Sequence, residues 1–307
     1  MILLQTVLFV GGLLIVILGA DWFTDAAVWF ARRTGIPKVL IGATVVSIAT
    51  TLPEFAVSVS ASLTGHPDVA LGNAVGSVTA NSGLIAALSL ISGRQVPEVS
   101  VFLSSGVLML LSGVAVAVLA LDGAVARVEG LLLFMLLALY IIRAVRSARA
   151  TSTGSATKTS GSAMPAVVKF MLGSVLIALG SRGMVMGGVD LAKVLGIPEM
   201  VVGLTMMAVG TSIPELVTAL ASLLKGHQDL SLGNILGANF LNMTWVLGGS
   251  AIFGRVTAQA LAITRDIPVM LCFMGALVVF GVFGRGVGRA GGVLLIGSYA
   301  LYVLSLF

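Results

Sequence analysis

The sequence predicts an all-α polytopic membrane protein in which ten transmembrane helices form two inverted five-helix repeats. Of its 307 residues, 58% are hydrophobic and 9% are charged, whereas a soluble domain carries about 25% charged residues. The apolar residues fall into runs of about 20, the length at which an α-helix crosses a bilayer. In addition, the segment 35–81 recurs as 196–242 with 17 identities in 47 positions. These observations exclude a water-exposed globule and indicate an internal duplication.

Ten spans result when the apolar runs are divided at glycines, prolines and clusters of charge. The first run lacks the basic residues and the small-residue cleavage site of a signal peptide, so we interpret it as the first span. A segment rich in Ser, Thr and Gly at 146–163 is typical of a flexible linker, and it separates the repeat 1–145 from the repeat 164–307. The predicted spans are 2–31, 37–63, 69–93, 98–120, 125–145, 164–193, 198–224, 230–253, 260–282 and 288–306.

The two halves are related by a constant offset of 161 residues, which carries position 35 to position 196. The tripeptide Gly-Ile-Pro at 35–37 recurs after this offset, and so does the dipeptide Pro-Glu at 53–54. Because each half holds an odd number of spans, the second copy enters the membrane from the opposite side. Inverted repeats of this kind recur in secondary transporters, whose sites lie near the bilayer midplane between the repeats.

Positively charged residues predict the orientation in the cell membrane, because cytoplasmic loops carry an excess of Lys and Arg. If the N-terminus lies outside, most of the Lys and Arg residues fall in cytoplasmic loops. We therefore predict that both termini lie outside and that the linker 146–163 is cytoplasmic. The cytoplasmic set is Arg32, Arg33, Lys38, Arg94, Arg143, Arg146, Arg149, Lys158, Lys169, Lys225, Arg285 and Arg289, and the opposite set is Arg127, Lys193, Arg255 and Arg265.

Two acidic residues fall well inside predicted spans, Glu54 in the second and Glu215 in the seventh. A carboxylate at the bilayer centre costs about 2.5–3.5 kcal/mol on the scale derived from membrane insertion. A role in helix packing does not explain two such carboxylates at repeat-equivalent positions. We therefore expect both residues to be functional. Asp21, Asp25 and Arg182 also fall within long spans. For these three we favour a structural charge pair or a place near the membrane surface.

Hydroxyl residues precede each of the two glutamates. Thr50 and Thr51 stand four and three residues before Glu54, and they therefore share its helical face. Thr211 and Ser212 stand in the same way before the second glutamate. Each repeat thus places two hydroxyls and one carboxylate together.

A proline directly before each glutamate removes one helix hydrogen bond. Carbonyl groups freed in this way can point at an ion, as in the broken helices of transporters. The next span of each repeat adds amide and hydroxyl oxygens at helical spacing. The expected free carbonyls lie near Ser47 and Ala49 and near Ala208 and Gly210, and the added side chains are Asn73, Ser77 and Asn81 with Asn234 and Asn242.

The expected ligand set consists of carboxylate, hydroxyl, amide and carbonyl oxygens, with no Cys or His among them. Hard cations select such ligands, and Ca²⁺ takes six to eight oxygens. His66 and His227 lie in short loops beside glycines, which favours a role in the turn over gating or pH sensing. No resident cofactor is predicted, and the absence of a basic stripe with aromatic residues argues against nucleic acid binding.

These motifs resemble those of the cation/Ca²⁺ exchanger superfamily, particularly the prokaryotic sodium/calcium exchangers. The resemblance rests on Ala-Thr-Thr-Leu-Pro-Glu at 49–54 and Leu-Gly-Asn at 71–73, with their counterparts Gly-Thr-Ser-Ile-Pro-Glu at 210–215 and Leu-Gly-Asn at 232–234. The motif regions cover 35–84 and 196–250, and the pattern of spans extends the resemblance to the whole chain.

The resemblance implies an antiporter that exchanges Ca²⁺ for Na⁺ by alternating access, with the first and sixth spans sliding across the bundle. Glu54 and Glu215 would hold Ca²⁺, and Na⁺ would compete for the same carboxylates. The backbone carbonyls of Thr50 and Thr211 would assist Ca²⁺. Na⁺ would also use Thr51, Ser77, Ser212 and the carbonyls of Ser47 and Ala208, while Asn81 and Asn242 would line the central pocket.

The chain departs from the family pattern at several positions. Ala238 stands where its repeat partner has Ser77 and where relatives carry a hydroxyl, and Ala49 and Thr51 replace the usual Gly and Ser. A weakened Na⁺ pocket with two membrane glutamates also fits H⁺/Ca²⁺ exchange. An enzyme is disfavoured because no Ser/His or Cys/His pair falls in the central spans. A channel is disfavoured because the site lies within one chain, for which we expect only the ions and the bilayer as partners.

Overall fold

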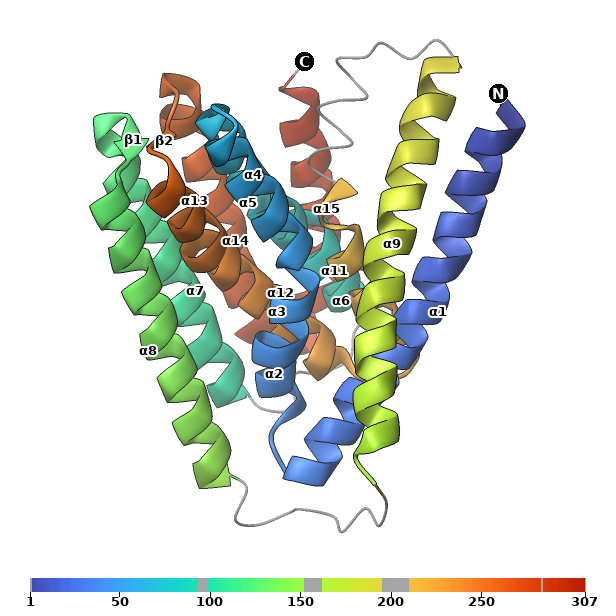
Figure 1. Cartoon of the computed structure of the whole chain (residues 1–307). Helices are drawn as coiled ribbons and strands as arrows, with labels where there is room; N and C mark the ends of the chain where they lie inside the picture. Colours follow the sequence, from blue (N-terminus) through green and yellow to red (C-terminus); the bar gives the residue numbers. More distant parts are fainter. Residues whose placement is uncertain (1, 93–98, 152–161, 195–209, 283, 307) are drawn as a thin grey trace.

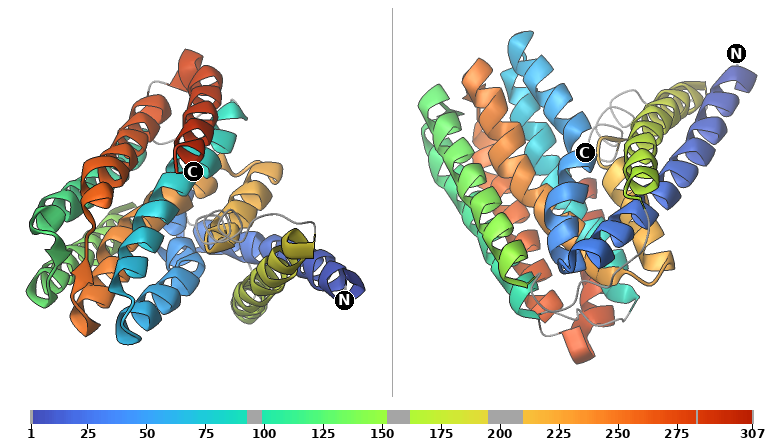
Figure 2. Two further views of the ribbon diagram at one scale, coloured as in Figure 1. Left: turned by 90° about the horizontal axis from the view of Figure 1, so that it is seen from above. Right: turned by 60° about the horizontal axis from the view of Figure 1, so that its bottom comes forward.

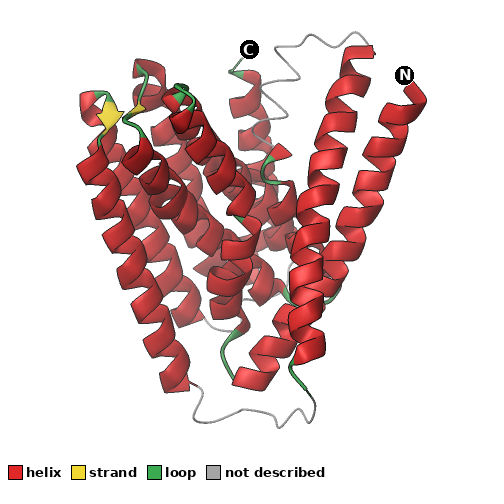
Figure 3. Ribbon diagram, viewed as in Figure 1, coloured by secondary structure: helices red, strands yellow, loops and turns green. Residues whose placement is uncertain are grey.

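The computed structural model describes residues 2–92, 99–151, 162–194, 210–282 and 284–306, and most of these residues are helical (Figure 3). The first half of the chain is a series of helices that π-helical turns interrupt. Its elements are α1 (Ile2–Thr34), α2 (Lys38–Ile41), the π-helix η1 (Gly42–Val46), α3 (Ser47–Thr50), α4 (Leu52–Leu63), α5 (Pro67–Ala80), the π-helix η2 (Asn81–Ile85), α6 (Ala86–Ile91), α7 (Val99–Leu119), the 3₁₀-helix η3 (Ala120–Asp122), β1 (Ala124–Val125) and α8 (Arg127–Thr151).

The second half repeats the order of the helices as far as they are described. Its elements are α9 (Met164–Val194), α11 (Ile213–Leu224), α12 (Gln228–Leu241), the π-helix η4 (Asn242–Val246), α13 (Leu247–Phe253), β2 (Val256–Thr257), the π-helix η5 (Ala262–Asp266), α14 (Ile267–Val282) and α15 (Gly284–Leu304). The strand of this half precedes α14, whereas β1 follows α7. The two strands, which the sequence did not predict, form a single antiparallel pair between loops.

The described part of the chain contains seven helices that are long and apolar enough to cross a membrane. An eighth span results if the segment from α2 to α3 and helix α4 are taken as one helix that bends by 45°. Shorter apolar helices, Ile213–Leu224 and Gly288–Leu304, fall within the seventh and tenth predicted spans. The first part of the seventh span, up to residue 209, lies outside the described residues. The prediction of an all-α membrane protein is confirmed.

Helices α1 and α9 form a pair that stands to one side of the other helices (Figures 1 and 2). A Cβ atom at Gly19 would collide with the backbone at Gly173 and Ile177, and one at Gly180 would collide with the backbone at Gly12. Small residues let the backbones of membrane helices approach closely. The pair is therefore held together by backbone contact along its length.

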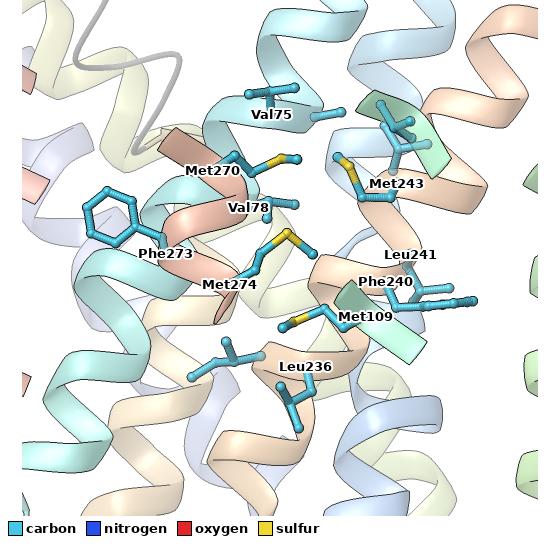
Figure 4. Close-up of a cluster of buried hydrophobic side chains, with 14 of the residues drawn as sticks. Val75, Val78, Met109, Leu236, Phe240, Leu241, Met243, Met270, Phe273 and Met274 are labelled. Carbon is cyan, nitrogen blue, oxygen red and sulfur yellow. The ribbon is translucent and has the colours of Figure 1, made fainter. Parts of the chain in front are cut away.

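The largest hydrophobic cluster joins both halves of the chain. Met109, Met243, Met270 and Met274 are fully buried and belong to this cluster, with Leu236 below Met109 in the view of Figure 4. Methionine is unbranched and flexible, so it fills irregular gaps between helices. This cluster packs α5, α7, α12 and α14 into one body behind the site described below.

Glycines of α12 bring it against the bent second span. A Cβ atom at Gly233 would collide with the carbonyl of Val39, and one at Gly237 would collide with the carbonyl of Ala43. Only a glycine allows backbones to approach this closely. The contact positions α3 of the first repeat directly beside α12 of the second.

Candidate functional site

Two helix breaks of matching geometry form the centre of the candidate site. Thr51 separates α3 from α4 with φ −84° and ψ −2°, and its repeat equivalent Ser212 precedes α11 with φ −86° and ψ 7°. Both lie in the sparsely populated bridge region, which is common among active-site residues. Pro53 and Pro214 occupy the first turn of the helices that follow, where proline is tolerated. The predicted breaks are therefore present in both repeats.

Glu54 and Glu215 lie in the first turns of α4 and α11, and both are fully buried. The two first turns lie next to each other, because the hydroxyl of Thr51, three residues before Glu54, donates to Oε1 of Glu215. Among the described residues, neither oxygen of Glu54 and only one oxygen of Glu215 has a hydrogen-bond partner. A buried carboxylate without such partners requires a compensating cation or a proton.

Hydrogen bonds cross between the repeats in a symmetric pattern. The hydroxyl of Thr50 donates to the amide oxygen of Asn234 over 3.3 Å, and the hydroxyl of Thr211 donates to that of Asn73 over 3.2 Å. Thr50 and Thr211 are repeat equivalents, and so are the two asparagines. The site is thus built jointly by the two halves. The sequence predicted that Asn73 and Asn234 contribute amide oxygens to the site. It did not predict that each accepts a hydrogen bond from a threonine of the other repeat.

Other contacts break the symmetry. The hydroxyl of Thr51 donates to Oε1 of Glu215 over 3.3 Å, whereas the hydroxyl of Ser212 has no partner among the described residues. Ser77 lies 3.3 Å from the hydroxyl of Thr211, but its equivalent Ala238 carries no hydroxyl. The two repeats therefore present different sets of oxygens.

Two asparagines begin the equivalent π-helices η2 and η4. Asn81 and Asn242 are fully buried, and π-helical turns inside helices occur frequently at functional sites. The amide group of Asn242 donates to the carbonyl of Ala238 over 3.0 Å. Its oxygen, and both polar atoms of Asn81, have no partner within the described part of the chain. Since η2 packs on α11 and η4 on α4, each asparagine belongs to an element that contacts the glutamate-bearing helix of the other repeat.

One carbonyl that the sequence predicted to be free is already bonded. The carbonyl of Ser47 accepts the N–H of Thr51 over 2.9 Å and the hydroxyl of Thr50 over 3.3 Å. The reason is that Pro53 removes only its own N–H, which would have bonded the carbonyl of Ala49, so the preceding turn stays helical. The hydroxyl of Ser47 donates to the carbonyl of Thr44 over 3.1 Å. The second predicted carbonyl, that of Ala208, lies outside the described residues.

The α1–α9 pair closes one side of the site. A cavity of about 10 Å³ is lined by Thr50, Pro53 and Pro214 of the broken segments and by Phe23 of α1 and Ile177 of α9. This volume is about the room that one water molecule needs. The boundary between the helix pair and the broken helices therefore passes directly beside Thr50.

Charges near the ends of the helices lie apart from this centre. Lys225 pairs with Asp21 over 2.7 Å and with Asp25 over 2.5 Å, so of the two expected alternatives these aspartates form charge pairs. The repeat equivalent of Asp21, Arg182, is exposed. Hydrogen bonds with both aspartates outweigh burial and raise the pKa of Lys225.

The two histidines occupy equivalent turns but have different surroundings. His66 and His227 precede α5 and α12. His66 is exposed, whereas Nδ1 of His227 lies 3.0 Å from Nζ of Lys38. Burial and the positive charge of Lys38 lower the pKa of His227. The turns themselves rely on Gly65 and Gly226, which have φ values of 85° and 78° that favour glycine.

The fold and this centre define a class of protein. Membrane-length helices that enclose buried carboxylates and amides are typical of transporters, because polar groups inside a membrane mark ion and substrate pathways. No group of three His, Cys, Asp or Glu residues comes together within the described residues.

Comparisons with known proteins identify the family. The sodium/calcium exchanger protein family model matches residues 4–146 and 165–307, so the chain belongs to the sodium/calcium exchanger family. It is accordingly a transporter and not an enzyme. The inner membrane protein YrbG of Escherichia coli is 36% identical, over 99% of this chain and 97% of that protein. The sodium/calcium exchanger MaX1 of Methanosarcina acetivorans is 27% identical, over 96% of each chain.

A solved relative has the same fold throughout. A structure of the sodium-calcium exchanger NCX_Mj, soaked with 100 mM Na⁺ and 10 mM Sr²⁺, matches with a TM-score of 0.88 and 29% identity. The match covers 100% of both chains. The predicted family resemblance is therefore confirmed.

Proposed function

We propose that the protein is a secondary active antiporter that exchanges Ca²⁺ for Na⁺ across the membrane. The observation that carries this proposal is the pair of buried, repeat-equivalent carboxylates, Glu54 and Glu215, among oxygens supplied by both repeats. Two carboxylates balance the charge of one Ca²⁺ ion, which prefers six to eight oxygen ligands. The similarity to MaX1 and NCX_Mj, both named as sodium/calcium exchangers, supports this assignment.

Competition for shared ligands couples the two ions. Glu54 and Glu215 would bind Ca²⁺ together with the backbone carbonyls of Thr50 and Thr211, and Na⁺ would displace it from the same carboxylates. Mutually exclusive occupancy makes the protein an exchanger and not a uniporter, provided that it changes conformation only when loaded. The remaining Na⁺ ligands would be Thr51, Ser77, Ser212 and the carbonyl of Ala208, with Asn81 and Asn242 lining the centre.

Alternating access would require the α1–α9 pair to slide against the rest of the bundle. The small cavity beside Thr50 lies on this boundary, so a displacement of the pair would open or close the site. The proposed topology has ten spans in the inverted repeats 1–145 and 164–307, motif regions at 35–84 and 196–250, a cytoplasmic linker at 146–163 and both termini outside. A single chain contains the complete site and would function alone.

Exchange of H⁺ for Ca²⁺ is the second candidate. The missing hydroxyl at Ala238 favours it, and so do the two oxygens of Glu54, which have no partner among the described residues, because a buried carboxylate without donors takes up a proton readily. In that case both glutamates would alternate between H⁺ and Ca²⁺.

Radioactive Ca²⁺ uptake into proteoliposomes distinguishes the candidates. One set of vesicles is loaded with Na⁺, and a matched set carries only a pH gradient. We expect uptake that follows the Na⁺ gradient, resists a protonophore and is lost in Glu54→Gln and Glu215→Gln. Glu129→Gln, at the start of α8, serves as the control because this carboxylate caps the N–H of Ala126, far along the chain from the site. Uptake that follows the pH gradient would favour proton exchange, and uptake that survives loss of both glutamates would refute both candidates.

A further inference from the structure

The ammonium group of Lys225 joins two parts of the molecule that the proposed function requires to move. It lies at the turn after α11, in the main body of the bundle, and reaches α1. It contacts Oδ1 of Asp21 over 2.7 Å, the backbone carbonyl of Asp21 over 2.8 Å and Oδ1 of Asp25 over 2.5 Å. An ammonium group has three N–H donors, so these contacts use all of them.

This contact differs from the ordinary exposed ion pair. The carboxylates of Asp21 and Asp25 are about half exposed, but Lys225 has only one quarter of its side chain exposed, and one of its three acceptors is a backbone carbonyl that cannot rotate away. Exposed single pairs contribute little, because solvent and salt screen them. Three acceptors around one partly buried cation hold the two elements in a single relative position.

Among the residues that the structure describes, the repeat-equivalent position has no such contact. The offset that relates the halves carries Asp21 to Arg182 and Lys225 to Thr64. Arg182 is exposed, and the hydroxyl of Thr64 donates to carbonyls of its own helix, at Ser60 and Ala61. In a transporter built from inverted repeats, exchanging the conformations of the two halves converts one end state into the other. A contact between the halves whose repeat-equivalent counterpart is absent therefore stabilises only one of the two states.

We propose that Lys225, Asp21 and Asp25 form an ionic clasp that fixes the α1–α9 pair in the conformation described and sets the balance between the two access states. Lys225 is thus a positioning residue for transport that does not touch the transported ion. This inference rests on the proposed function only in taking sliding of the pair as the transport movement.

The chain offers a matched control for the clasp. Lys169 of α9 also pairs with Asp25, over 3.5 Å. Since α1 and α9 move together, this ion pair stays the same in both states, and its loss leaves their balance unchanged. Lys169→Met and Lys225→Met thus remove the same charge from the same carboxylate with different expected effects.

The balance between the two access states can be measured directly as the distance between one spin label on the α1–α9 pair and another on the rest of the bundle. The exposed Cys272 is first replaced by Ser, and labels are attached at Leu14→Cys on α1 and Leu63→Cys at the end of α4, both exposed. The full-length protein is measured in lipid nanodiscs, without ions and with saturating Ca²⁺. For Lys225→Met we expect the ratio of the two distance populations to change about fivefold, and for Asp21→Asn in the same direction by a smaller factor.

Lys225→Arg, which keeps the charge and several donors, should retain the original ratio, as should Lys169→Met. The clasp is refuted if Lys225→Met leaves the ratio unchanged, if Lys169→Met shifts it equally, or if every variant gives one and the same distance. Size-exclusion profiles identify any variant that fails to fold, and Asp21→Asn then provides the test from the α1 side. The readout needs no ion flux, so a failure of the clasp is distinguishable from an absence of Na⁺/Ca²⁺ exchange in vesicles.

Discussion

Replacing Asn73 by Ala should destabilise the protein more than the same change at its repeat equivalent, Asn234. Asn73 accepts a hydrogen bond from Thr211 and donates to Ser58 over 2.9 Å and to the carbonyl of Glu54 over 3.4 Å. Asn234 accepts from Thr50, and its amide nitrogen has no partner among the described residues. The two substitutions thus remove different numbers of hydrogen bonds from symmetric positions.

The expected difference follows from this count. Hydrogen bonds between membrane helices average about 0.6 kcal/mol, so Asn73→Ala should cost about 2 kcal/mol and Asn234→Ala about 0.6 kcal/mol. Both changes delete the same atoms, so the cavity contribution largely cancels. Burial alone predicts the opposite order, because Asn234 is fully buried and Asn73 is 5% exposed.

Reversible unfolding in lipid bicelles, followed by steric trapping, measures both free energies. The experiment is done without Na⁺ or Ca²⁺, because a bound ion would stabilise the native state by mass action. Thr211→Val and Thr50→Val complete double-mutant cycles, and each should give a coupling of about 0.6 kcal/mol. Equal losses for the two asparagines, or a larger loss for Asn234→Ala, would show that the hydrogen bonds between the repeats do not determine stability at this site.

Further substitutions test other parts of the fold. Gly237→Ala should lower the free energy of unfolding by about 1–3 kcal/mol, because the added methyl group overpacks against Ala43. Gly275→Ala should cause no such loss, because its methyl group meets no atom within 4 Å, and the same unfolding assay compares the two variants. Tyr140→Phe should cost about 1 kcal/mol, because the Tyr140 hydroxyl donates to the Ala43 carbonyl, and no loss would mean that this bond contributes nothing. The lowered pKa of His227 means that the folded protein disfavours the protonated ring, so its stabilising contribution is complete above pH 6.5 and is lost as the pH falls below that value. Melting temperatures at several pH values should therefore fall more steeply in acid for the natural protein than for His227→Asn, and parallel curves would contradict the assignment.

Periodicity and duplication were enough to single out Glu54 and Glu215, which the structure buries in the first turns of equivalent helices. Buried glutamates after prolines, at equivalent positions of two repeats, are a local pattern that few alternatives explain. The pattern could not predict the hydrogen bonds between the repeats, because Thr50 and Asn234 are brought together only by the packing of α3 against α12. That packing depends on Gly233 and Gly237, which a sequence shows merely as small residues.

Local helix geometry explains the error at Ser47. The prediction treated proline as disrupting the whole preceding turn, but a missing N–H at Pro53 affects a single carbonyl four residues earlier. Lys225 illustrates a different difficulty. The sequence assigned it a topological role from its charge, and nothing in the sequence placed it beside Asp21 and Asp25. Long-range ion pairs of this kind follow from helix packing, so no local pattern predicts them.

The two glutamates differ in their hydrogen bonds because Thr51 carries a methyl group that its repeat equivalent, Ser212, lacks. Thr51 is β-branched, so its side chain has few rotamers and its hydroxyl is held toward Glu215. Ser212 at the equivalent position lacks the methyl group, and its hydroxyl makes no bond to Glu54 within the described residues. Glu215 therefore has one donor in this structure, whereas Glu54 has none among the described residues and depends on a cation or a proton for compensation. Of the two carboxylates, Glu54 should for this reason be the one whose occupancy decides when the protein can change conformation.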